Sequence, residues 1–221
     1  MAAPIKADGI LLDLDGTLWD AVEGICRGWN AGFAACGLEP NLTVPQLRAC
    51  MGLLMEDIAA RILPQIPTVP ARMEIMAVCY RYQLQYLSRH GGTLYPGVRE
   101  TLEILAGTLP LFIVSNCQDG YIQCFLRYYH MEPLIRDFLC PGQSGRAKAE
   151  NIAALVRRYG LQHPVYVGDT QGDCAAAHAA GVPFLHAAYG FGTVEGAEGS
   201  IASFDQLSGA VVPLRPAPGR P

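Results

Sequence analysis

The sequence has 221 residues and a formal net charge of −4, with 51% of its residues hydrophobic and 16% charged. This length suits one medium domain or a core with an inserted module, and the composition is typical of a packed globular protein rather than a disordered one. The acidic balance argues against nucleic-acid or membrane-surface partners, and no apolar run approaches the roughly 20 residues that span a bilayer.

The beginning of the chain, MAAPIKADGI, has no signal-peptide h-region, so we expect a cytoplasmic protein. The eight cysteines form no CxxC pair and do not cluster with histidine at zinc-binding spacing. We therefore expect reduced, mostly buried thiols rather than disulfides or a zinc site.

Residues 9–18 begin as an apolar run of strand-forming residues and end in two acids and a glycine. Asp13 and Asp15 are two residues apart, so they would share one face if the strand stayed regular. Two buried carboxylates repel each other unless a cation or a shared proton is present. The stretch, which turns at Gly16, therefore predicts a metal-bound reactive site at the carboxyl end of a strand.

Residues 20–90 contain several helical patterns and no convincing strand. The expected helices are 19–36, 43–52, 55–63 and 71–90. A segment with three prolines separates the last two, and Gly91 follows the longest. This pattern is typical of a helical module inserted into another domain.

After residue 92 the pattern changes to strands and helices in alternation. The expected strands are 109–114, 138–140, 165–167 and 182–187, and the expected helices are 98–105, 120–129, 147–159 and 172–180. Such alternation predicts an α/β fold with a doubly wound parallel sheet covered on both faces. We predict a core formed by 1–19 and 91–206, a helical insertion over 20–90, and a flexible Pro-rich tail over 207–221.

Polar residues follow three of these strands directly. Ser115 and Asn116 follow the second strand, and Asp169 follows a later one, with Asp173 one helical turn beyond. Lys148 lies between them near the start of a helix. Because the carboxyl ends of parallel strands meet at one edge of a sheet, we expect these residues to join the two acids of the first strand.

These motifs, in this order, resemble those of the haloacid dehalogenase-like hydrolases. The matching elements are DxDGT at 13–17, a hydrophobic strand that ends at Ser115, a lysine at Lys148, and GDxxxD at 168–173. The insertion resembles the C1-type cap of the phosphoglycolate-phosphatase-like branch, and the resemblance implies a Rossmann-like core. Many relatives have proline after the motif lysine, where this chain has Ala149. Arg146 is a second cation nearby, but an ammonium that bridges carboxylate and phosphate is the usual requirement there.

The resemblance implies a role for each reacting group. Asp13 would attack phosphorus and form an aspartyl-phosphate, which splits hydrolysis into two steps. Asp15 would protonate the leaving oxygen and then activate water. Lys148 would stabilise the charge of both the nucleophile and the phosphoryl group.

The resemblance also implies a magnesium site and a phosphate site. Mg²⁺ would bind Asp13, the backbone carbonyl of Asp15 and Asp169, with Asp173 as a ligand through water or as a neighbour of the ligands. The phosphoryl group would contact Ser115, Asn116, Lys148 and the backbone N–H of Gly16. The expected activity is Mg²⁺-dependent hydrolysis of small phosphorylated metabolites by a monomer or a homodimer.

Other members of the same superfamily fit less well. Dehalogenases lack the second acid, which is present here as Asp15, and phosphonoacetaldehyde hydrolases need a cap lysine that the segment 20–95 lacks. A mutase of the β-phosphoglucomutase type needs a cap arginine where this chain has Met55, although Arg48 and Arg61 are cations of the same insertion. A phosphomutase and a non-hydrolytic, phosphate-responsive regulatory protein remain the alternatives.

Overall fold

Strand β2, Gly9–Leu12, is central to a six-stranded parallel sheet in the computed structural model, which describes residues 4–214. Its neighbours are β5, Leu111–Val114, and β7, Pro164–Gly168, and both pair with it in parallel. The strand order is β6-β5-β2-β7-β8-β9, where β6 is Asp137–Leu139, β8 is Phe184–Ala187 and β9 is Gly199–Ile201. The predicted parallel α/β sheet is confirmed.

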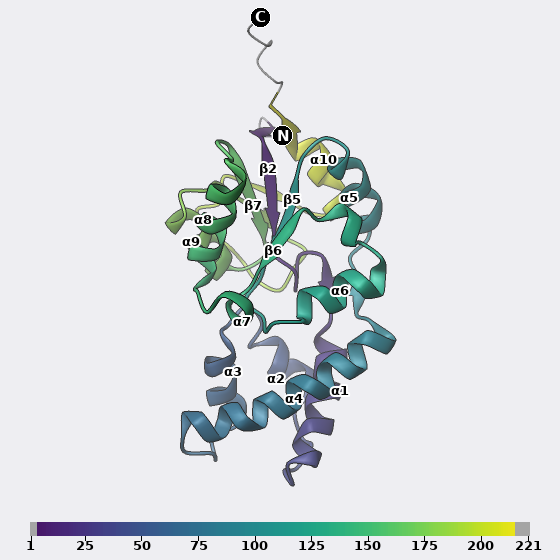
Figure 1. Ribbon diagram of the computed structural model, residues 1–221, viewed down its shortest axis with the longest axis vertical. Helices are drawn as coiled ribbons and strands as arrows, with labels where there is room; N and C mark the ends of the chain where they lie inside the picture. The colour runs from purple at the N-terminus through teal and green to yellow at the C-terminus, as the bar shows by residue number, and fades with distance from the viewer. Residues whose placement is uncertain (1–3, 215–221) are drawn as a thin grey trace, which may run out of the picture.

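Helices cover both faces of this sheet (Figure 1). Helices α8, Lys148–Tyr159, and α9, Gln171–Ala179, pack on the face that carries Leu11. Helices α5, Val98–Ala106, and α6, Tyr121–Tyr129, pack on the opposite face, which carries Ile10 and Leu12. The two sets of side chains alternate because successive strand residues point to opposite faces. Each buried Leu or Ile contributes about 1.5–3 kcal/mol relative to an exposed one, so this alternation fixes the strand against its helices.

The helical insertion, residues 20–90, extends from the carboxyl edge of the sheet (Figure 1). Its helices are α1 Val22–Ala35, α2 Val44–Arg48, α3 Met55–Ile62 and α4 Val69–His90. Gly28 and Gly32 of α1 lie directly against the backbone of α4, since an added Cβ would be only 2.6 Å from the Cα of Gln83 and 2.5 Å from that of Cys79. Glycine spacing of four residues therefore lets the two longest helices pack closely.

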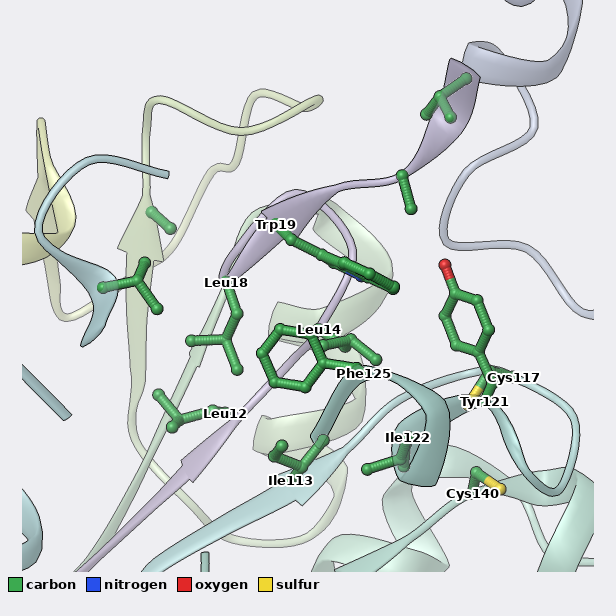
Figure 2. Packing of buried hydrophobic residues seen from close by; sticks show 14 of the residues in the cluster. Leu12, Leu14, Leu18, Trp19, Ile113, Cys117, Tyr121, Ile122, Phe125 and Cys140 are labelled. Atoms are coloured by element: carbon green, nitrogen blue, oxygen red, sulfur yellow. The ribbon is translucent and has the colours of Figure 1, made fainter. Parts of the chain in front are cut away.

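Two short antiparallel strands, β3 Trp19–Asp20 and β4 Thr93–Leu94, connect the insertion to the sheet. They lie next to the boundaries that the sequence predicts for the insertion, and the division into two modules remains a prediction. Trp19 is fully buried, with its ring 5.0 Å from that of Phe125 and 5.6 Å from that of Tyr121 (Figure 2).

The expected flexible tail is wrong for its first residues. Helix α10, Leu207–Ala210, leads into strand β10, Val211–Pro213, which pairs in parallel with β1, Ile5–Ala7. Leu207 and Val211 are buried, and this burial anchors the segment against the core. Residues 215–221, the rest of the predicted tail, lie outside the described residues.

The remaining helical elements are short and follow the insertion along the chain. They are η1 Glu132–Leu134, α7 Pro141–Ser144 and η2 Phe204–Gln206. None of the helices within residues 4–214 combines the length and the apolar character that crossing a bilayer requires.

Candidate active site

Three neighbouring strands end at one edge of the sheet, beside the insertion. Asp13 follows β2 and its backbone N–H donates to the Val167 carbonyl at 2.8 Å. Ser115 and Asn116 follow β5, and Asp169 follows β7. The strand order β5-β2-β7 therefore places these residues at adjacent strand ends, as the sequence predicts.

Lys148 joins two of the acids. Its Nζ donates to Asp13 Oδ1 at 2.7 Å and to Asp173 Oδ1, and all three side chains are buried. Burial opposes the charge of Lys148, but Asp13 and Asp173 together raise its pKa well above the usual lysine value. Arg146, the other candidate cation, is exposed.

Three buried carboxylates form a cluster that one ammonium does not neutralise. Oxygen atoms of Asp13, Asp169 and Asp173 lie within 4.8 Å of one another. Burial, with repulsion from the neighbouring acids, raises the pKa of Asp13 to about 6 and that of Asp169 to about 8.

Asp169 has one oxygen free for a ligand. Its Oδ2 accepts the Phe191 N–H at 2.7 Å, whereas its Oδ1 is buried and has no hydrogen-bond partner among the described residues. Both oxygens of Asp173 already accept hydrogen bonds, Oδ1 from Lys148 Nζ and Oδ2 from the Thr170 hydroxyl at 2.7 Å. An acid cluster with an unpartnered oxygen fits a hard divalent cation such as Mg²⁺.

Two glycines make room for the Asp169 carboxylate. A Cβ on Gly16 would lie 2.1 Å from Asp169 Oδ2, and one on Gly190 would lie 2.3 Å from Asp169 Cβ. Gly16 also has φ +85°, a left-handed conformation that other residues rarely adopt. The backbone therefore packs directly on this carboxylate and fixes its position.

Asp15 points to a different group. Strand β2 ends at Leu12, so Asp13 and Asp15 are not carried on one face of a regular strand. Asp15 Oδ1 accepts the Tyr121 hydroxyl at 2.8 Å, and the Asp15 side chain is not part of the acid cluster. Burial raises the pKa of Asp15 to about 8, with a smaller contribution from Asp13.

The turn between α2 and α3 reaches the same edge. Asn116 Nδ2 donates to the Gly52 carbonyl at 3.1 Å, and a Cβ on Gly52 would lie 3.2 Å from Thr170 Cγ2. Arg48 Nη2 pairs with Asp20 Oδ2 at 2.8 Å, and its guanidinium lies 5.0 Å from the centre of the Phe191 ring. The insertion therefore contacts the core on both sides of the acid cluster.

Several residues around the site are absent from the sequence prediction. They are Tyr121, Thr170, Gly190 and Phe191. Thr170 had a local signal, because Thr before a helix with Asp three residues later is a capping pattern. The glycine-rich run after the last predicted strand signals a close backbone approach. Tyr121 has no local signal, because its partner lies 106 residues away in the sequence.

Comparison with known proteins gives a consistent result. A family model described as haloacid dehalogenase-like hydrolase matches residues 10–187. A phosphoglycolate phosphatase from Haemophilus influenzae is 29% identical over 191 residues, which cover 81% of this chain and 84% of that protein. A 5'-nucleotidase from Pseudomonas aeruginosa is 25% identical over 196 residues, which cover 86% of this chain and 87% of that protein. The structure of a haloacid dehalogenase-like family hydrolase from Streptococcus pneumoniae matches with a TM-score of 0.79 and 21% identity. The match covers 91% of this chain and 97% of that one.

Proposed function

We propose, from the premise that this chain belongs to the haloacid dehalogenase-like hydrolases, that it is a Mg²⁺-dependent phosphatase for small phosphorylated metabolites. One observation carries the proposal: Lys148 binds Asp13 beside a buried acid cluster that still has an unpartnered oxygen. A nucleophilic carboxylate, a fixed cation and room for a second cation are what phosphoryl transfer to an aspartate requires.

The first step transfers the phosphoryl group to Asp13. A carboxylate oxygen of Asp13 forms a bond to phosphorus while the bond from phosphorus to the ester oxygen breaks. Asp15 gives its proton to that leaving oxygen, and the pKa of about 8 keeps Asp15 protonated for this purpose near neutral pH. Lys148 offsets the charge that develops between Asp13 and the phosphoryl oxygens.

The second step hydrolyses the aspartyl-phosphate. The ionised Asp15 accepts a proton from a water molecule, whose oxygen attacks phosphorus. The bond between phosphorus and the Asp13 oxygen breaks, which releases inorganic phosphate and restores both carboxyl groups. Closure of the insertion through Gly52 would exclude other water from the site.

The residues present fit the predicted magnesium ion. Asp13, Asp169 and the backbone carbonyl of Asp15 would hold it, and Asp173 would act through a water because both its oxygens are already engaged. The ion would neutralise charge between the carboxylates and the phosphoryl group.

The phosphoryl group would contact the strand ends and the turn after β2. Ser115, buried at the end of β5, and the backbone N–H of Gly16 would donate to phosphoryl oxygens. Asn116 would contribute through its backbone, since its side-chain amide is used by Gly52.

A panel of phosphomonoesters tests the activity directly. Phosphoglycolate and nucleoside 5'-monophosphates enter the panel because similar proteins carry those names, with p-nitrophenyl phosphate as the generic ester. We expect phosphate release that requires Mg²⁺ and stops with a chelator. A well-folded protein that hydrolyses none of these esters contradicts the proposal.

The metal-free protein is expected to lose stability as the pH rises. The raised pKa values of Asp13 and Asp169, about 6 and about 8 against 3.8 for an ordinary aspartate, favour the folded state only while the groups are protonated. The free energy of unfolding with chelator should therefore fall from about pH 4 to about pH 8, and 100-fold excess of Mg²⁺ over its Kd should restore about 2.7 kcal/mol at the upper end. Urea unfolding at several pH values measures both effects.

A pair of single variants separates this site from general charge effects. Asp169→Asn should lose most of the stabilisation by Mg²⁺, because it removes the unpartnered oxygen. Glu103→Gln, which changes an exposed acid on α5, should retain it. Equal stabilisation by Mg²⁺ in both variants contradicts the assignment of the metal to the acid cluster.

Asn116→Ala is expected to weaken closure of the insertion. Loss of the one hydrogen bond to Gly52 should lower kcat/KM by no more than roughly tenfold. It should lower the free energy of unfolding by less than about 1.5 kcal/mol. Steady-state kinetics and urea unfolding measure the two quantities. Asn30→Ala is the matched control, because the side-chain amide of Asn30 donates a hydrogen bond to the Leu42 carbonyl inside the insertion. This variant should affect stability only. Unchanged kcat/KM in Asn116→Ala contradicts this role.

A further inference from the structure

Tyr121 of helix α6 contacts the proposed acid–base group, Asp15. It is the first residue of α6, and its hydroxyl donates to Asp15 Oδ1 at 2.8 Å. The side chain is only 1% exposed, so water does not compete for this hydrogen bond. No motif of the sequence analysis includes this residue.

The packing around Tyr121 fixes the direction of its hydroxyl. The Trp19 ring lies 5.6 Å away at an interplanar angle of 55°, and Figure 2 shows the Tyr121 hydroxyl pointing away from Ile122 and Cys140. A tyrosine hydroxyl has an ordinary pKa of about 10 and is protonated near neutral pH. It therefore acts as the donor in this pair.

We propose that Tyr121 is a positioning residue for Asp15: it occupies Oδ1, so that Oδ2 is the oxygen that exchanges protons with the reacting groups. The proposal rests on the function proposed above, in which Asp15 is the acid and then the base. In the first step the Oδ2 proton passes to the ester oxygen as its bond to phosphorus breaks. In the second step Oδ2 takes a proton from the attacking water.

This role predicts an effect that depends on the leaving group. An alkyl oxygen is strongly basic and needs a well-aimed proton when it leaves, whereas nitrophenolate is a weak base and leaves without one. A residue that only supports the fold would change the two reactions by the same factor. The parameter to compare is kcat/KM, because it covers the steps up to formation of the phosphoenzyme.

The experiment compares Tyr121→Phe with the unmodified protein on an alkyl phosphate from the panel and on p-nitrophenyl phosphate. We expect kcat/KM to fall roughly tenfold or more for the alkyl ester and less than about twofold for the aryl ester. Both values come from one preparation, so a partly unfolded variant leaves their ratio unchanged. Equal losses on the two esters, or no loss on either, overturn the proposal.

Two further variants complete the design. Tyr129→Phe is the matched control, because Tyr129 is on the same helix and donates its hydroxyl to the Gly92 carbonyl at 2.7 Å instead. It should leave the ratio unchanged. Asp15→Asn sets the largest possible ratio. If Asp15→Asn lowers kcat/KM more for the alkyl ester than for the aryl ester and Tyr121→Phe does not, the positioning role of Tyr121 is wrong but the acid role of Asp15 stands. If Asp15→Asn lowers both by the same factor, the acid role of Asp15 is wrong as well.

Discussion

Asp13→Asn is expected to reduce Mg²⁺-dependent turnover by at least about 10³-fold, because an amide oxygen is a poor nucleophile and no other described carboxylate is placed to replace it. In the proposed site the free oxygen of Asp169 holds the metal, and both oxygens of Asp173 accept hydrogen bonds from Lys148 and Thr170, so neither acid is expected to replace Asp13. Steady-state hydrolysis of the best ester of the panel measures the loss.

The covalent step gives a second measurement. Rapidly quenched wild-type protein should carry one phosphoryl group on the peptide that contains Asp13, and the asparagine variant should carry none. Lys148 keeps its contact with Asp173 in the variant, so the protein should remain folded. Asp137→Asn, at a partly exposed pair with Arg158, is the control and should retain turnover. Near-normal turnover in Asp13→Asn would remove this residue as the nucleophile.

Five of the six strands of the sheet could be predicted from the sequence because their signals are local; the edge strand β9 was not predicted. Residues 111–114 and 164–168 form short apolar runs, and each is followed directly by polar residues. Since parallel strands bring their carboxyl ends to one edge, the order of motifs along the chain also predicts which side chains meet. No knowledge of the packing of individual helices is needed to bring the strand-end residues Asp13, Ser115 and Asp169 together.

The contacts of Asp15 could not be predicted in the same way. Its position in the motif indicates a second acid, but regular strand geometry would place it beside Asp13. The strand ends at Leu12 instead, and the direction of the Asp15 side chain depends on a hydroxyl from α6. Which residues meet across such a distance in the chain is decided by packing, which the local pattern does not contain.

Short terminal strands were missed for a different reason. Strands β1 and β10 have three residues each, and three residues are too few to show an alternating pattern. Prolines near Val211 favour a loop when they are considered alone. The strand forms because Val211 is buried and its neighbours pair with Ile5–Ala7 at the other end of the chain.

Lys148→Met is expected to lower turnover by about 10²-fold or more and to destabilise the metal-free protein by up to about 3–5 kcal/mol, the usual cost of removing one partner from a buried ion pair. Asp13 and Asp173 would then face each other without the ammonium that lies between them. Because ionisation of these acids becomes less favourable, the loss of stability should grow as the pH rises. Steady-state kinetics and urea unfolding at two pH values measure these effects.

The control for Lys148→Met removes the neighbouring cation. Arg146→Met makes the same change in net charge two residues earlier. Because Arg146 is exposed, the turnover and stability of this variant should stay near those of the wild type. Lys148→Arg should fail to restore activity, since a planar guanidinium does not fit the buried space of an ammonium between two carboxylates. If Arg146→Met loses turnover and Lys148→Met keeps it, the motif cation is Arg146, and the contact between Lys148 and Asp13 serves only the fold.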